Sequence, residues 1–145
     1  GTKYESPDRM GIDRWLAIYS ILGKRQGYSV VVDAGTALTV DVLDGQLHLG
    51  GYIVPGYLSQ LNSMSTSAAL PIVQGKDSSV DLGLDTVSCM ERGVWRMLSS
   101  FVSSIVEKYP GAGLYITGGD ANKLAKLFSY PCEVHENLVI DGLYY

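Results

Sequence analysis

Short runs of alternating or β-branched hydrophobic residues dominate the chain from residue 28 to residue 54. The run YSVVVD at 28–33, and two alternating runs at 37–43 and 46–54, predict three strands. The pair Asp44-Gly45 separates the two alternating runs, and an Asp-Gly pair in that position favours a type I′ hairpin turn. The pattern therefore predicts an antiparallel meander of three strands.

Hydrophobic residues at helical spacing follow and precede this meander. The segment DRWLAIYSILGKR at 13–25 predicts a helix that stops near Gly23, and a short helix is expected near 56–65. The longest helix is predicted over 85–108, where one apolar stripe continues for about five turns. A strand at 114–118 then leads through two glycines into a helix at 119–128. This order predicts an α/β domain with a mixed sheet covered by helices.

Composition narrows the class of protein. The 145 residues are 46% hydrophobic and 18% charged, with a net charge of −4, which favours one folded domain without a basic surface for nucleic acid. No apolar run is long enough to span a membrane, so no membrane partner is expected. Cys89 and Cys132 lack the spacing of a metal site, and a reducing cytoplasm is the expected location.

Two strand ends carry glycine turns that suit phosphate chemistry. In VVVDAGTALTVDV a buried strand ends at Asp33, turns at Gly35 and continues through Thr36. Glycine lets the backbone approach an anion, threonine hydroxyls donate to phosphate oxygens, and a carboxylate can hold the neutralising cation. The alternative is an ordinary hairpin turn with a solvated aspartate.

In YITGGDANKL, Gly118 and Gly119 lie between a strand and a helix, where backbone N–H groups form an anion site. Asp120 is expected to cap that helix, and simple helix entry is the alternative. Together the two turns resemble the two-sided nucleotide cleft of the actin-like ATPase and sugar-kinase superfamily.

The opening stretch YESPDRMGIDRW completes the pattern. By itself, the pair Asp13-Arg14 favours helix capping and a surface ion pair. The stretch is, however, similar to the substrate signature of the type III pantothenate kinases. Four further segments, DAGTALTVD, GGYIVPG, DTVSCMERG and TGGDA, resemble motifs of that family in the same order.

The resemblance implies a ribonuclease H-like (actin-like ATPase) domain that phosphorylates pantothenate with ATP and Mg²⁺, the first step of coenzyme A biosynthesis. Asp13 matches the general base that accepts the proton of the substrate hydroxyl. Gly11, Ile12 and Arg14 match the substrate loop around it, and Tyr4 matches a substrate-contacting tyrosine. A carboxylate at a helix N-terminus is favoured in its ionised form, which suits a proton acceptor.

Further roles follow from the same resemblance. Asp33 matches the ligand of a monovalent cation, K⁺ or NH₄⁺, and Thr36 matches an ATP contact, with Gly35, Gly118 and Gly119 on the nucleotide side. Thr86 matches a substrate contact reached across a homodimer interface, and the long helix over 85–108 is the expected packing surface.

The resemblance also implies an incomplete enzyme. Residues 1–145 are expected to form a single domain similar to the C-terminal domain of the family, without the N-terminal phosphate-loop domain, and to be nearly inactive alone. A non-catalytic accessory or regulatory protein on the same fold is an alternative, as is another small-molecule kinase of the superfamily.

Four other polar or reactive residues are expected to play no part in the site. His48 and His135 have no partner spacing for a metal or a general base. Asp41, close to Thr39, could face the cleft, but an exposed strand position is favoured, and Cys89 is expected to be buried in the long helix.

Overall fold

A five-stranded mixed sheet forms the centre of the molecule. The computed structural model describes residue 18 and residues 26–68 and 78–135. The strand order is β3-β2-β1-β4-β5; β1 is antiparallel to β2 and β2 to β3, whereas β4 is parallel to β1 and β5 to β4. The strands span Tyr28–Ala34 (β1), Ala37–Asp44 (β2), Leu47–Pro55 (β3), Gly113–Thr117 (β4) and Glu133–Val134 (β5).

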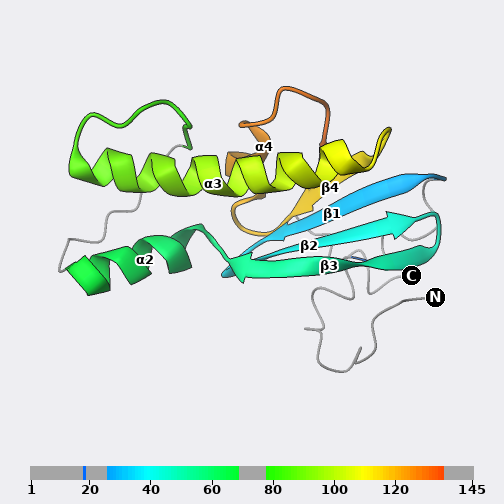
Figure 1. The fold of residues 1–145 in the computed structure, drawn as a ribbon, viewed down its shortest axis with the longest axis horizontal. Coiled ribbons are helices and arrows are strands. Elements are labelled where there is room, and N and C mark those ends of the chain that lie inside the picture. The colour runs from blue at the N-terminus through cyan, green and yellow to red at the C-terminus, as the bar shows by residue number, and fades with distance from the viewer. Residues whose placement is uncertain (1–17, 19–25, 69–77, 136–145) are drawn as a thin grey trace.

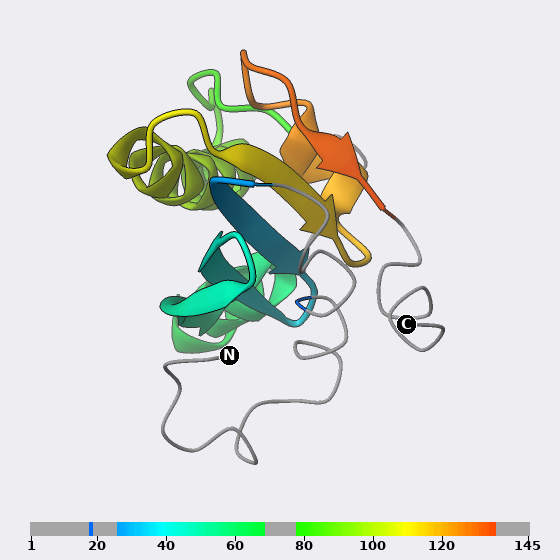
Figure 2. The same ribbon diagram turned by 90° about the vertical axis from the view of Figure 1, so that its right-hand side faces the viewer.

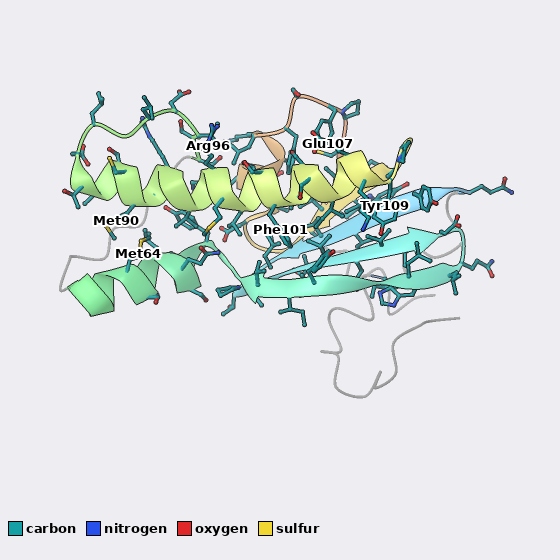
Figure 3. All side chains as sticks on the ribbon, in the orientation of Figure 1. Met64, Met90, Arg96, Phe101, Glu107 and Tyr109 are labelled. Carbon is teal, nitrogen blue, oxygen red and sulfur yellow. The ribbon has the colours of Figure 1, made fainter. Side chains whose placement is uncertain are left out.

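The helices cover one face of this sheet and extend past its end. The helices with described bounds are α2 (Tyr57–Ala68), α3 (Thr86–Lys108) and α4 (Ala121–Ala125). Figure 1 shows α2 leaving the end of β3 and continuing away from the sheet, below the first half of α3. Figure 2 shows α3 lying against one face of the sheet. Beyond the sheet, Met64 of α2 and Met90 of α3 lie in the space between the two helices, both partly buried (Figure 3).

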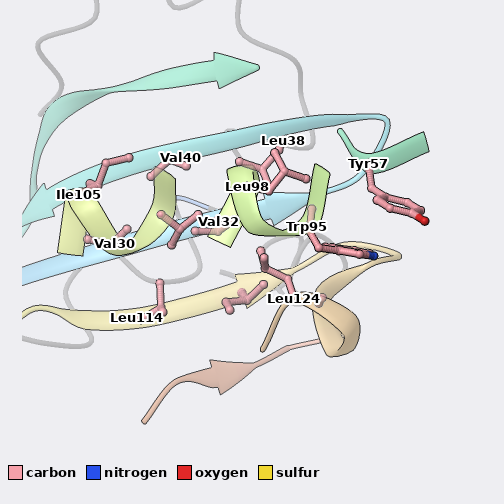
Figure 4. Close-up of a cluster of buried hydrophobic side chains, with 14 of the residues drawn as sticks. Val30, Val32, Leu38, Val40, Tyr57, Trp95, Leu98, Ile105, Leu114 and Leu124 are labelled. Atoms are coloured by element: carbon pink, nitrogen blue, oxygen red, sulfur yellow. The ribbon is translucent and has the colours of Figure 1, made fainter. Parts of the chain in front are cut away.

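Alternate residues of the strands supply the core between the sheet and α3. Val30 and Val32 of β1 and Val40 of β2 are completely buried, and they meet Leu98 and Val102 of α3 in one hydrophobic cluster (Figure 4). Burying each such side chain contributes about 1.5–3 kcal/mol. The period of two along the strands and the stripe along α3 therefore fix which face of each element points inward.

The meander and the long helix are confirmed. β1, β2 and β3 form the expected antiparallel ladder, and the long helix differs from its expected bounds by one residue. The hairpin turn falls at Gly45-Gln46, one residue later than expected, with φ of +58° at Gly45. Of the helix expected over 13–25, only Ile18 is among the described residues; it is helical and completely buried.

The start of α3 is fixed by a capping box. The backbone N–H of Ser88 donates to the Asp85 carboxylate at 2.8 Å, and the Ser88 hydroxyl accepts from the backbone N–H of Asp85. Arg92 donates to the carbonyl oxygen of Leu82 at 2.7 Å, which ties the preceding segment to the second turn of the helix. The two capping-box bonds satisfy the N–H groups of Ser88 and Asp85 at the helix N-terminus, and the Arg92 bond satisfies the Leu82 carbonyl.

Two expectations about single residues are wrong. Asp41 is 1% exposed rather than solvated. His48 is equally buried, and its Nε2 atom donates to Oδ1 of Asp41 at 2.8 Å. Cys89 is exposed, because it lies outside the buried stripe of α3. In the described part of the chain, no helix combines the length and apolarity that crossing a bilayer requires.

Candidate functional site

Three polar side chains lie side by side on one face of the sheet, near the end of β1. Asp33 is next to the last residue of β1, and the strand register places it beside Thr39 of β2 and Thr117 of β4. The Thr117 hydroxyl donates to the carbonyl oxygen of His135 at 2.5 Å. Because β1 and β4 are parallel neighbours, their carboxyl ends meet here, where open α/β sheets bind ligands.

The turn between β1 and β2 is held from the far side by the start of α2. The carbonyl oxygen of Thr36 accepts two hydrogen bonds, one from the backbone N–H of Gly56 at 2.8 Å and one from the Ser59 hydroxyl at 2.9 Å. A Cβ atom on Gly56 would lie 2.1 Å from the carbonyl oxygen of Gly35, so only glycine fits. The Thr36 side chain remains exposed.

The turn after β4 packs directly against Asp33. Gly118 has a φ of +100°, and a Cβ atom there would lie 2.6 Å from Oδ1 of Asp33 and 2.7 Å from the carbonyl carbon of Ala34. The backbone N–H of Asp120 donates to the Ala34 carbonyl oxygen at 3.0 Å. The structure thus brings Asp33 together with both glycine turns, whereas Gly119 is exposed and has open space at its Cβ position.

Asp120 does not cap α4 as expected. It occupies the N-cap position, but its side chain makes no capping hydrogen bond. Burial raises the pKa of the Asp120 carboxyl, and the nearby Lys123 ammonium partly offsets that effect. The carboxyl is therefore held at the turn without the hydrogen bonds that normally stabilise its charge.

Sequence reasoning missed a second group of residues, which lies at the start of α2, beside the β1–β2 turn. Tyr57, the first residue of α2, is 3% exposed, and its phenol donates to Oε2 of Glu91 at 3.1 Å. Its ring stacks on Trp95 with the ring centres 4.3 Å apart (Figure 4). Burial raises the pKa of Tyr57 above its usual range, and the Glu91 carboxylate raises it further. The only sequence signal for this group was the tyrosine after the Pro-Gly turn.

The other predicted site residues are not brought to the glycine turns by the described chain. Thr86 is the exposed first residue of α3, whose N-terminus projects past the end of the sheet (Figure 1). Tyr4, Gly11, Ile12, Asp13 and Arg14 lie outside the described residues. Within the described residues, no group of three or more His, Cys, Asp and Glu side chains could hold a metal ion.

Two solved structures of other proteins have a similar fold. A Campylobacter jejuni protein described as a Baf family transcriptional activator superposes with a TM-score of 0.72 at 29% identity, covering 98% of this chain and 64% of that one. An activator of 2-hydroxyisocaproyl-CoA dehydratase from Clostridium difficile, solved with bound ADPNP, gives a TM-score of 0.51 at 12% identity over 90% of this chain and 62% of its own. At this low identity, the similarity to the dehydratase activator supports the actin-like ATPase fold and nothing about function.

Sequence comparison gives the family. Curated type III pantothenate kinases from Acinetobacter baumannii and Hahella chejuensis are 35% and 38% identical to the chain over 142 and 139 residues. These matches cover 97% and 92% of this chain, which spans 57% of the length of each relative. The model of the type III pantothenate kinase family matches residues 1–108. On these grounds, and with its glycine turns gathered around Asp33, the chain belongs to the type III pantothenate kinase family.

Proposed function

We propose that this chain forms part of an enzyme that transfers the γ-phosphoryl group of ATP to pantothenate. The product would be 4′-phosphopantothenate, in the first step of coenzyme A biosynthesis. The observation that carries the proposal is the packing of Gly118 against the Asp33 carboxylate, which gathers two glycine turns at the carboxyl ends of parallel β1 and β4. Membership of the family supplies the reaction.

The glycine turns would hold the phosphates of ATP and its Mg²⁺. Gly119 places a backbone N–H group near the carboxyl end of β4, and the exposed Thr36 adds a hydroxyl donor. The backbone N–H of Gly35 donates to the carbonyl oxygen of Ala37 at 3.1 Å and so holds the shape of the β1–β2 turn. Gly118 keeps the two turns in contact. Phosphoryl transfer passes through a loose transition state, so such donors act mainly by positioning the phosphates and stabilising their charge.

Asp33 would hold the monovalent cation, K⁺ or NH₄⁺. Oδ1 of Asp33 and the carbonyl oxygen of Ala34 both border the position that a Cβ atom on Gly118 would take, and both are hard oxygen atoms of the kind that a cation of low charge density prefers. When bound, such a cation would neutralise charge on the phosphate oxygens. Asp33 itself contributes a fixed negative charge beside Gly118.

The residues that would bind pantothenate, the phosphoryl acceptor, belong to the opening stretch YESPDRMGIDRW. Asp13 would accept the proton of the pantothenate hydroxyl as its oxygen bonds to the γ-phosphorus and the bond to the bridging oxygen of ADP breaks. Arg14 would pair with the pantothenate carboxylate, and Gly11, Ile12 and Tyr4 would line the substrate. ADP leaves with the electron pair of the broken bond.

Thr86 would reach the substrate of a second subunit. Its place at the projecting N-terminus of α3 supports this role, because the described chain does not bring it to its own glycine turns (Figure 1). The proposed enzyme is therefore a homodimer, and a cytoplasmic location is the one that suits its substrates.

A regulatory protein on the same fold is the second candidate. The description of the Campylobacter jejuni relative as a transcriptional activator favours it. A net charge of −4 gives no electrostatic attraction to nucleic acid. ATP binding without turnover would favour the regulatory candidate over the kinase.

Replacing the proposed base tests the kinase directly. Because the chain spans 57% of its relatives, the assay uses residues 1–145 joined to the part of the Hahella chejuensis kinase that the chain does not span, here called the fused enzyme. We expect Asp13→Asn to reduce pantothenate-dependent ADP release by about 10²-fold or more while ATP binding persists. Asp8→Asn, in the same stretch, is the control and should retain activity. Loss of folding in Asp13→Asn would instead assign Asp13 a capping role.

A further inference from the structure

Tyr57 makes a polar contact that packing alone does not require. A phenylalanine could stack on Trp95 in the same way, yet the buried phenol oxygen reaches across to the Glu91 carboxylate on α3. The two residues are 34 positions apart in the chain. A hydrogen bond to a charged group in a partly buried place is worth more than an exposed one.

Two residues near Tyr57 hold the β1–β2 turn, which contains Gly35 and Thr36. Gly56 and Ser59 both donate to the carbonyl oxygen of Thr36. Tyr57 therefore belongs to a turn whose other donors fix the position of the β1–β2 turn. A shift of this phenol would move the start of α2 and, through it, the Gly35-Thr36 backbone.

Glu91, at the other end of this hydrogen bond, lies on the same regular helix, α3, as Thr86. It is five residues after Thr86, and the intervening turn is fixed by the Asp85 capping box. Gly83 packs so closely on this turn that a Cβ atom there would lie 2.4 Å from the backbone nitrogen of Cys89. The position of Glu91 is therefore transmitted to Thr86 through regular helix.

The charges around the phenol keep it a hydrogen-bond donor. Burial raises the pKa of Tyr57 and the Glu91 carboxylate raises it further; the Trp95 side chain lowers it in part, and the Asp120 carboxylate of the β4–α4 turn raises it slightly. The phenol therefore stays protonated throughout the pH range in which enzymes work. Side chains from α2, α3 and the β4–α4 turn contribute to this single group.

We propose that Tyr57 is a positioning residue whose hydrogen bond to Glu91 sets the place of the Thr86 end of α3 relative to the Gly35-Thr36 turn. The inference rests on the proposed function, because it links the side of the protein proposed for pantothenate to the side proposed for ATP. Tyr57 and Glu91 touch neither substrate in this scheme. They keep the two binding regions in register.

Two variants and a matched control test the inference. Tyr57→Phe removes the hydroxyl and keeps the ring, and Glu91→Ala removes its acceptor. Tyr52→Phe is the control, because Tyr52 also packs its ring on α3, edge-on to Phe101 at 5.5 Å, but is 50% exposed. Hydrogen exchange is followed in the 145-residue chain for residues 34–38 and 86–93, and KM and kcat are measured in the fused enzyme.

We expect Tyr57→Phe to speed exchange in both segments by about three- to tenfold and to raise KM for pantothenate by a similar factor, with a smaller change in kcat. In the Glu91→Ala background the same substitution should have no further effect, which is the sign of a direct coupling. Tyr52→Phe should change neither quantity.

The inference would be overturned if Tyr57→Phe and Tyr52→Phe changed exchange rates and KM equally. It would also be overturned if the effects of the Tyr57 and Glu91 substitutions on these quantities were independent and multiplied in the double variant. If the unsubstituted fused enzyme shows no turnover, the kinase proposal fails by itself. The exchange measurement then still decides whether the hydrogen bond holds the two segments in register.

Discussion

Single glycines decide the geometry around Asp33. Gly118 has a positive φ and lies where any side chain would meet both the Asp33 carboxylate and the backbone of Ala34. Gly119, its neighbour, has open space at the same position. Two adjacent glycines in one motif thus have different reasons to be there, and only the first has a structural need for its missing side chain.

Replacing each glycine by alanine separates these reasons. We expect Gly118→Ala to lower the free energy of unfolding by about 2–4 kcal/mol, because it adds backbone strain to a clash with Ala34 and Asp33. Gly119→Ala should change it by less than about 0.5 kcal/mol. Urea unfolding of both variants measures the difference, and equal losses would show that the packing of Gly118 on Asp33 is not as described.

Sequence reasoning misplaced two residues, Asp41 and Cys89, for different reasons. Asp41 lies on a strand whose pattern allowed either exposure or burial, and its partner His48 comes from the next strand, next to a register shift between Val42 and Leu43. A pairing that depends on a shifted register cannot be predicted from the spacing of the two residues. Cys89 falls on the exposed side of α3 because the buried stripe is narrower than its apolar composition suggested.

Among the secondary-structure elements, α3 depends on the capping box at its start. The Ser88 backbone N–H holds the pKa of the Asp85 carboxyl below its usual range, so the ionised carboxylate is the form that stabilises the folded helix. This contribution is present above the pKa that Asp85 has in the unfolded chain. It is lost as the pH falls through the lower pKa of the folded state.

Removing the cap should therefore have a pH-dependent effect. We expect Asp85→Ala to lower Tm by a few degrees at pH 7, and the difference from the unsubstituted chain to shrink as the pH falls below about 4. Asp81→Ala, in the same exposed segment but outside the cap, is the control. Thermal unfolding monitored by circular dichroism at several pH values measures both, and a difference that stays constant down to pH 2 would contradict the capping role.

Most elements were predictable, but the two-residue strand β5 and the end of α4 were not. The strands of the meander and α3 follow from alternation and from the helical stripe. β5 escaped notice because it has two residues and exists through its pairing with β4, including the bond from the His135 N–H to the Ile116 carbonyl oxygen. α4 ends at Ala125 rather than 128, and its last residues continue as turns closed by i to i+3 bonds from Leu127 and Phe128.

At the scale of the whole molecule, the turns and the substrate residues were predicted by different means. Physical reasoning from the residues predicted the strand-end turns at Gly35 and Gly118, and the structure brings both to Asp33. The roles of Tyr4, Asp13 and Thr86 came from the family resemblance, because isolated polar residues have no chemistry that spacing alone can reveal. Their assignment remains a prediction.

We propose that the reaction also needs the part of the curated relatives that this chain does not span. The chain spans 57% of its curated relatives, and a cleft that binds ATP from two sides needs a second set of phosphate donors. We therefore expect the 145-residue chain alone to be nearly inactive. The fused enzyme should gain activity because it supplies the other side of the cleft.

The most direct test is pantothenate-dependent ADP release, measured with ATP and Mg²⁺ for the 145-residue chain and for the fused enzyme, in potassium and again in sodium. We expect turnover by the fused enzyme that is faster in potassium and greatly reduced by Asp33→Asn, with little turnover by the chain alone. No pantothenate-dependent ADP release by the fused enzyme in either salt, under conditions in which the intact Hahella chejuensis kinase is active, would contradict the proposed kinase function.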